Sequence, residues 1–121
     1  MKASVLISTY NQEKVIGQAI EGALSQTTDF DFEIVVGEDC STDSTRAVIC
    51  GYRDRYPDRI RPLFREHNLG LMRNLPESFL ACRGEYVACL DGDDYWTNPH
   101  KLQRQVEFLD AHPDCSICFH N

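Results

Sequence analysis

The 121-residue sequence predicts an α/β fold built on a mostly parallel sheet, with helices on both faces. Two observations lead to this class. Short strand-like runs alternate with helix-like segments along the chain, and several of the strands are apolar on both faces. A strand that is apolar on both faces needs a covering layer on each side. The expected architecture therefore has three layers, with the sheet in the middle.

The chain opens with a short strand and a helix. Ala3–Ser8 is a β-branched, apolar run that predicts a buried strand. Asn11 is expected to cap the helix, because its side chain can accept a backbone N–H at a helix start. The apolar residues that follow recur at helical spacing from Val15 to Leu24.

A second strand and helix lead into a weaker third strand. Phe32–Gly37 is apolar on both faces. Either Ser41 or Thr42 can cap the next helix, which Pro57 ends. The third strand, Ile60–Arg65, contains a proline, which cannot donate to a strand ladder. This strand is therefore expected at an edge of the sheet.

The second half of the chain repeats the alternation. A short helix is expected over Met72–Cys82, followed by a fourth strand, Glu85–Leu90, again apolar on both faces. Asn98 and the proline after it should open the next helix, because proline is favoured at the first helical position. Pro113 ends that helix, and Cys115–Phe119 begins a fifth strand. With the third strand at an edge, the expected strand order is 3-2-1-4.

Composition limits the classes of function. The net charge of -7, from 12 basic and 19 acidic side chains, disfavours nucleic-acid binding. There is no signal peptide and no apolar run near the roughly 20 residues that cross a bilayer. A cytoplasmic location is expected, with the inner face of a membrane as an alternative reached only through parts outside this sequence. Residues 1–121 are expected to form a single, truncated domain.

The six cysteines are interpreted as reduced, buried thiols of a cytosolic protein. They lie mostly within apolar segments, without a secretory context. Cys115 and Cys118 have the spacing of zinc ligands, and His120 follows them. No second ligand pair exists, so a structural zinc site is disfavoured.

Polar residues follow three of the expected strands at one edge of the sheet. These are Thr9-Tyr10-Asn11, Glu38-Asp39 and Asp91-Gly92-Asp93-Asp94. In open α/β sheets, ligands bind beyond the carboxyl ends of the strands, where the strand order reverses. Neighbouring carboxylates repel each other, and Mg²⁺ or Mn²⁺ would relieve that repulsion. Gly92 would let the backbone turn sharply beside a ligand. The alternative interpretation is a solvated acidic turn.

Other residues near this edge are candidates for ligand contacts. Asp39 can accept a hydrogen bond from a base or a ribose hydroxyl, or it can only cap the following helix. Tyr10 can stack on a base or pack under its loop. Asn11 can leave the positive helix end free for phosphate. Arg73 can contact a pyrophosphate, and Trp96 can wall a sugar pocket or pack between helix and sheet.

Together these residues resemble family 2 glycosyltransferases of the GT-A fold, which is three-layered and Rossmann-like. The resembling stretches are Ser4–Asn11, Glu38–Asp43, Asn68–Gly70, Gly84–Trp96 and Lys101–Val106. They cover essentially the whole chain in the family's order. Cys40 departs from the pattern, since asparagine or another small polar residue is frequent at its position.

The resemblance implies roles for individual residues. The first loop, with Thr9, Tyr10 and Glu13, would meet the base and ribose, and Asp39 would recognise the base, usually uracil. The D-x-D pair would contact the ribose and hold Mn²⁺ or Mg²⁺ on the diphosphate. That run comprises Asp91, Gly92 and Asp93, and Asp94 could share the metal.

The activity implied by the resemblance is inverting, metal-dependent transfer of a sugar from a nucleotide donor, most often a UDP-sugar, to a saccharide or other hydroxyl acceptor. Cell-surface polysaccharide synthesis is the expected context. The catalytic base is expected beyond Asn121, so the chain would hold the donor half without the acceptor half. One alternative is a sugar-nucleotide nucleotidyltransferase, which usually has a glycine-rich, basic loop after its first strand. The other is a non-catalytic nucleotide-binding module of the same fold.

Overall fold

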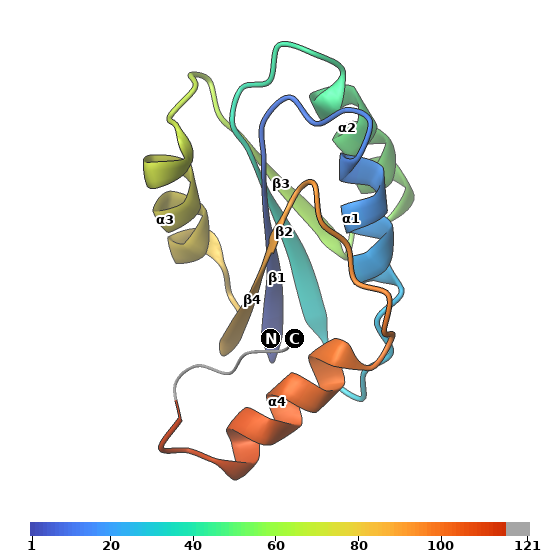
Figure 1. The fold of residues 1–121 in the computed structure, drawn as a ribbon, viewed down its shortest axis with the longest axis vertical. Coiled ribbons are helices and arrows are strands. Elements are labelled where there is room, and N and C mark those ends of the chain that lie inside the picture. Colours follow the sequence, from blue (N-terminus) through green and yellow to red (C-terminus); the bar gives the residue numbers. More distant parts are fainter. Residues whose placement is uncertain (116–121) are drawn as a thin grey trace.

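A computed structural model describes residues 1–115 and contains a four-stranded sheet with four helices (Figure 1). In chain order the elements are β1 (Ala3–Thr9), α1 (Ile16–Leu24), β2 (Phe32–Glu38), α2 (Thr45–Arg55), β3 (Ile60–Phe64), α3 (Leu71–Ala81), β4 (Tyr86–Asp91) and α4 (Lys101–Ala111). The strand order β3-β2-β1-β4, with every pair parallel, confirms the predicted order and the edge position of the third strand. The predicted fifth strand, together with Cys118 and His120, lies outside the described residues.

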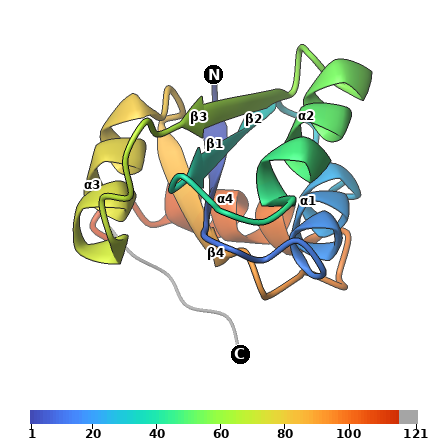
Figure 2. The same cartoon turned by 90° about the horizontal axis from the view of Figure 1, so that it is seen from above.

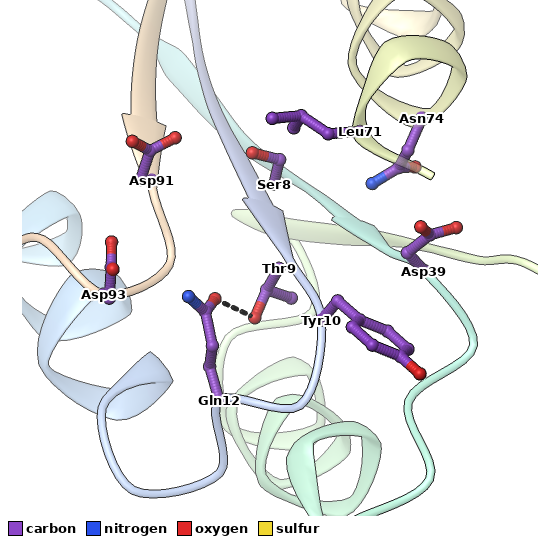
Figure 3. A pocket seen from close by; sticks show the side chains of 9 residues that line it. All are labelled: Ser8, Thr9, Tyr10, Gln12, Asp39, Leu71, Asn74, Asp91 and Asp93. Carbon is purple, nitrogen blue, oxygen red and sulfur yellow. Dashed lines mark hydrogen bonds between the residues drawn. The ribbon is translucent and has the colours of Figure 1, made fainter. Parts of the chain in front are cut away.

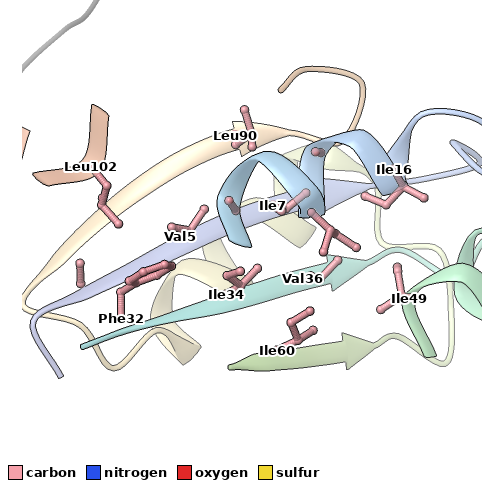
Figure 4. Packing of buried hydrophobic residues seen from close by; sticks show 14 of the residues in the cluster. Val5, Ile7, Ile16, Phe32, Ile34, Val36, Ile49, Ile60, Leu90 and Leu102 are labelled. Carbon is pink, nitrogen blue, oxygen red and sulfur yellow. The ribbon is translucent and has the colours of Figure 1, made fainter. Parts of the chain in front are cut away.

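Helices cover both faces of the sheet, as predicted. Seen from above in Figure 2, α3 lies on one side of the sheet and α1 and α2 lie on the other. The apolar core fills the second side, and α4 contributes to it (Figure 4). The core residues are Ala3, Val5, Ile7, Ile16, Ala19, Ile20, Ala23, Phe32, Ile34, Val36, Ile49, Ile60, Leu90, Leu102 and Val106. The strand members of this set sit at alternate positions, as the period of two in a β-strand requires.

The face toward α3 is held largely by buried hydrogen bonds. Glu33 is only 4% exposed, and its carboxylate accepts bonds from Ser4 Oγ at 2.6 Å and Arg83 N–H at 2.7 Å. The Arg61 guanidinium donates to the same carboxylate at 3.1 Å. Burial alone would raise the pKa of Glu33, but these donors together hold it below its ordinary value. Gly84 N–H donates to Ser4 Oγ at 2.8 Å, so the network fastens the loop after α3 to the sheet.

The side chains predicted to cap α1 and α2 instead join two loops to each other. Asn11 has a φ of 51° and lies five residues before the start of α1 at Ile16. Its Oδ1 accepts a hydrogen bond from Thr42 N–H at 2.8 Å. Ser41 Oγ accepts one from Asn11 N–H at 2.9 Å. Both cap predictions were wrong, because these polar groups bind partners about 30 residues away along the chain.

The starts of α2 and α4 also show contacts that differ from the prediction. Asp43 Oδ1 accepts bonds from Thr45 N–H at 2.9 Å and Thr45 Oγ1 at 2.6 Å, and it thereby supports the first residue of α2. The hydroxyl bond is the main reason that the pKa of Asp43 lies below its ordinary value. Pro99 precedes α4 instead of opening it. Its carbonyl oxygen accepts the Thr27 N–H at 2.8 Å, which ties this loop to the one after α1.

β4 is not buried on both faces as predicted. Cys89, near its end, is exposed, because β4 forms an edge of the described sheet. The five cysteines within residues 1–115 are free thiols, but none of them is fully buried, so that part of the prediction was wrong. Burial nevertheless raises the pKa of Cys82 to about 11. No helix in the described part of the chain is long and apolar enough to cross a membrane.

Replacing Glu33 tests the buried network. Glu33→Gln should lower the free energy of unfolding by about 1–3 kcal/mol, because an amide nitrogen would then face hydrogen-bond donors. The pKa of Glu33 in the folded protein lies below its ordinary value of 4.5. The stabilisation should therefore be complete above that value and be lost as the pH falls through the folded-state pKa. Urea unfolding between pH 7 and pH 3 measures both effects.

A matched control is Glu85→Gln. Glu85 is exposed and pairs with Lys2 at 3.2 Å, so its loss should change the free energy of unfolding by less than about 1 kcal/mol. Equal destabilisation by the two substitutions would contradict a special role for the Glu33 network.

Candidate functional site

A cavity of about 270 Å³ opens beyond the carboxyl ends of β1, β2 and β4 (Figure 3). It lies where the strand order reverses, because β1 pairs with β2 on one side and with β4 on the other. This is the predicted position for a ligand site in an open α/β sheet. The lining residues are Ser8, Thr9, Tyr10, Gln12, Asp39, Leu71, Asn74, Asp91 and Asp93.

Three carboxylates line the cavity, and no lysine or arginine is among the lining side chains. Asp91 ends β4 and Asp93 follows two residues later, while Asp39 comes from the loop after β2. An anionic ligand entering this cavity would therefore need a cation to accompany it.

Asp94, the third acid of the run predicted to bind metal, lies outside the cavity. Its Oδ1 accepts a hydrogen bond from Tyr95 N–H at 2.8 Å. Within residues 1–115, no group of three or more His, Cys, Asp or Glu side chains is arranged to hold a metal ion. Of the three acids in the predicted metal run, Asp91 and Asp93 offer oxygen ligands at the cavity. Mg²⁺ and Mn²⁺ commonly take few protein ligands and complete their shell with phosphate and water.

Asp39 fixes the approach to α3. Its side chain is almost fully buried, and Oδ1 accepts the Leu69 N–H at 2.7 Å while Oδ2 accepts the Gly70 N–H at 2.9 Å. Asn68 Nδ2 donates to the Asp39 carbonyl at 3.0 Å. Asp39 therefore anchors the loop before α3 and does not cap α2. An ionised carboxylate has about four acceptor positions, so each oxygen can still accept one bond from a ligand.

The turn after β4 packs closely on the loop after β1. Thr9 Oγ1 donates to Gln12 Oε1 at 2.7 Å. A Cβ placed on Gly92 would overlap Gln12 Oε1 and would come within 2.8 Å of Thr9 Oγ1. Gly92 is not among the residues with positive φ. What requires glycine here is the close approach of the two loops.

Four of the predicted nucleotide contacts lie outside the cavity lining. They are Asn11, Glu13, Arg73 and Gly92. Glu13 Oε2 accepts the Ser44 N–H at 3.3 Å, which joins the first loop to the start of α2. The Arg73 side chain is 67% exposed and pairs with Glu77 at 3.2 Å, one turn along α3. Their roles in ligand binding stay predictions.

Trp96 and Cys40 have structural roles in the fold. Trp96 is half-buried and packs against the apolar core, which favours the packing role over a sugar pocket. Cys40 has a φ of 60°, a left-handed conformation that asparagine adopts more readily than most residues. This backbone geometry is a physical reason for a small polar residue being frequent at that position.

Four lining residues were not predicted from the sequence: Ser8, Gln12, Leu71 and Asn74. Asn74 is 2% exposed, and its Nδ2 donates to the Gly37 carbonyl at 3.0 Å. Its partner one turn along α3, Ser78, is also buried, while Met72 and Leu80 are exposed. The two buried residues of this helix are therefore both polar. The i, i+4 spacing of Asn74 and Ser78 could have indicated a polar contact with the sheet.

Comparison with known proteins gives a consistent result. A family model described as Glycosyl transferase family 2 matches residues 4–120. An uncharacterized protein of Mycobacterium tuberculosis is 44% identical over 117 residues, which are 97% of this chain and 34% of that protein. An uncharacterized glycosyltransferase of Nostoc is 42% identical over 120 residues, 99% of this chain and 36% of that protein. The chain thus spans about a third of the length of these relatives.

A structurally characterised relative is also similar. The poly(ribitol-phosphate) beta-N-acetylglucosaminyltransferase TarS of Staphylococcus aureus is 36% identical over 118 residues, 93% of this chain and 19% of TarS. The crystal structure of TarS residues 1–349 with UDP-GlcNAc matches with a TM-score of 0.80 and 34% identity, and it covers 93% of this chain and 32% of that one. A Pyrobaculum calidifontis mannosyltransferase, at 24% identity and a TM-score of 0.80, shares the fold over 89% of this chain and 32% of its own.

The close approach of the two loops can be tested at Gly92. Gly92→Ala should lower the free energy of unfolding by about 1–3 kcal/mol, because the added methyl group overcrowds Thr9 and Gln12. Gly51→Ala is the matched control, since a Cβ on Gly51 in α2 meets nothing within 4 Å. The control should raise stability by about 0.5–1 kcal/mol through helix propensity. Circular dichroism measures the thermal unfolding of both variants. Equal changes in their stability would contradict a close approach of the two loops at Gly92.

Proposed function

The chain belongs to glycosyl transferase family 2, and from that premise we propose that residues 1–121 form the nucleotide-sugar-binding half of a glycosyltransferase domain. The whole enzyme would transfer a sugar from a nucleoside diphosphate to a hydroxyl of a saccharide or other acceptor, with inversion. The acceptor half and the general base would lie in other parts of the enzyme.

The observation that carries this proposal is the charge of the cavity. Three carboxylates line it without a lysine or arginine, at the reversal point of a parallel sheet. A neutral sugar alone would not require so many carboxylates, and a free diphosphate would be repelled by them. A diphosphate that enters with a divalent cation satisfies both the acids and its own charge. A nucleotide sugar with Mn²⁺ or Mg²⁺ therefore fits the cavity better than either part alone.

The lining residues suggest a division of roles along the donor. Tyr10, which is 45% exposed at the cavity, can stack its ring on the base. Asp39 keeps an acceptor position on each oxygen for a base N–H. Asp91 can accept a hydrogen bond from a ribose hydroxyl. Together these contacts would hold the nucleotide in one orientation, which directs the sugar's anomeric carbon toward the acceptor.

Asp91 and Asp93 are the residues that would hold the metal. Their carboxylate oxygens are ligands that a hard cation prefers, and both residues line the cavity. We leave Asp94 as the less favoured ligand, because its Oδ1 already accepts the Tyr95 N–H. A divalent ion bound there would neutralise the charge that grows on the departing nucleoside diphosphate. The protein's part is to hold the diphosphate still and to exclude other anions by its own negative charge.

One relative, TarS, supports a uracil base and a cell-surface context. TarS, at 34% identity over nearly the whole chain, is crystallised with UDP-GlcNAc, and its name gives poly(ribitol-phosphate) as the polymer it modifies. By this similarity we propose a UDP-sugar donor and a role in surface polysaccharide synthesis. The site would work on the cytoplasmic side, with any membrane contact made through other segments.

Nucleotide binding tests the proposed function. In calorimetry, UDP should bind in the presence of Mn²⁺ and bind at least about tenfold more weakly without it, a difference of about 1.4 kcal/mol. Asp93→Asn should remove the metal dependence, because it replaces a charged oxygen ligand by a neutral amide of the same size. Circular dichroism checks that the variant is folded.

The matched control is Asp58→Asn. Asp58 is exposed and lies just before β3, at the amino ends of the strands and away from the cavity. This variant should therefore bind UDP like the unchanged protein. UDP binding that is independent of metal, or that survives unchanged in Asp93→Asn, would refute the metal assignment. Tighter binding of GDP than of UDP would refute the proposed base.

A further inference from the structure

Gln12 is a neutral cavity residue whose backbone and side chain are both fixed by hydrogen bonds. Its backbone N–H donates to Thr45 Oγ1 at 2.8 Å, and its carbonyl oxygen accepts the Ile16 N–H at 2.9 Å. Its side-chain Oε1 accepts the Thr9 hydroxyl at 2.7 Å. The backbone is thus fixed by α2 and by the start of α1, and the side chain is fixed by β1.

The orientation of this amide leaves its nitrogen free for a ligand. Because Oε1 faces Thr9, Nε2 must point the other way, and Figure 3 shows it on the side of Asp93. Among residues 1–115, the structure shows no hydrogen bond from Nε2. No buried side-chain polar atom there lacks a partner, so Nε2 is reached from the open cavity. An amide N–H that points into an open cavity is available to a bound molecule.

The hydrogen-bond donors of the cavity lining indicate which part of a ligand the Gln12 nitrogen binds. Phosphate oxygens only accept hydrogen bonds, so a diphosphate needs donors, whereas ribose hydroxyls can donate to carboxylates. Of the other lining groups, the Thr9 hydroxyl is used by Gln12, and Asn74 Nδ2 donates to the Gly37 carbonyl. Ser8 adds a hydroxyl, but it offers no amide nitrogen. Tyr10 extends toward the Asp39 side of the cavity (Figure 3). Gln12 is therefore the oriented amide donor beside the two acids of the β4 end.

We propose that Gln12 binds the diphosphate of the nucleotide sugar, with Nε2 donating to a phosphate oxygen beside Asp91 and Asp93. This inference rests on the proposed function and assigns the phosphate contact to a residue of the first loop. A neutral donor suits this place. An arginine or lysine here would pair with the carboxylates and compete with the metal, but an amide contributes a hydrogen bond without taking a ligand from the ion.

The close contact with Gly92 supports the same role. A Cβ on Gly92 would overlap Gln12 Oε1 and lie 2.9 Å from the Thr9 Cβ, which cannot move away as a long side chain can. The amide, the Thr9 hydroxyl and the acidic turn are thus held as one unit, so that the donor nitrogen and the two carboxylates keep a fixed spacing. Pre-arranged groups of this kind bind a ligand with less loss of conformational freedom.

The test compares UDP with uridine, each with Mn²⁺, in calorimetry. Gln12→Met keeps the length of the side chain but has no donor, so UDP should bind about tenfold or more weakly, as expected for a lost bond to a charged group. Uridine, which has no phosphate, should bind within about twofold of its usual affinity, given that no bond is lost. Gln18→Met, an exposed position on α1, is the matched control and should change neither affinity.

A second variant guards against a folding defect. Gln12→Ala removes the side chain and cannot overcrowd Gly92, so it should fold and show the same selective loss of UDP binding. Equal weakening of UDP and uridine in both variants would overturn the inference. So would a fall in the affinity for Mn²⁺ alone, which would mean that Gln12 acts by positioning Asp93. If the unchanged protein failed to bind UDP with Mn²⁺, the proposed function itself would fail first.

Discussion

The pairing of β1 with a parallel strand on each side is the constraint on which the site depends. Ser8, at the end of β1, is in register with Gly37 of β2 and with Asp91 of β4. Because all three strands run the same way, the loops that follow them must leave the sheet together. Residues about 30 and 80 positions apart in the chain thereby line one cavity. An antiparallel neighbour on either side would have sent one of these loops to the opposite edge.

The two faces of the sheet are stabilised by different kinds of interaction. The side with α1, α2 and α4 buries apolar side chains, which supplies the non-directional part of the stability. The side with α3 relies on directional bonds, from Glu33 to its donors and from Asn74 to the Gly37 carbonyl. Hydrogen bonds fix a helix in one orientation more strictly than apolar contacts do, since they weaken steeply with angle. This fixes the start of α3, and with it Leu71 and Asn74, at the cavity wall.

The sequence was sufficient for the parts of the fold that depend on burial. Apolar runs located all four described strands, and a proline indicated the edge strand, so the strand order followed. It was insufficient where a side chain binds a partner distant in the chain. Asn11 has the character of a helix cap, but its partner is Thr42 in another loop. Gln12 belongs to no periodic pattern, and its importance comes only from its contacts with Thr9 and Gly92.

The acids of the cavity divide into two kinds, and this division explains how one cavity can be stable and still bind a charged ligand. Asp39 is buried, and both of its oxygens accept backbone N–H bonds, so its charge is compensated by the fold itself. Asp91 and Asp93 accept no such bonds from the described residues, and their charge remains available to a cation. A carboxylate that the fold has already satisfied can recognise a ligand by hydrogen bonding without binding metal. The unsatisfied pair must gain more from a cation, because close carboxylates repel each other when they are alone. In the proposed function, recognition of the nucleoside would thus be separated from binding of the charged diphosphate and its cation, on two strands that flank β1.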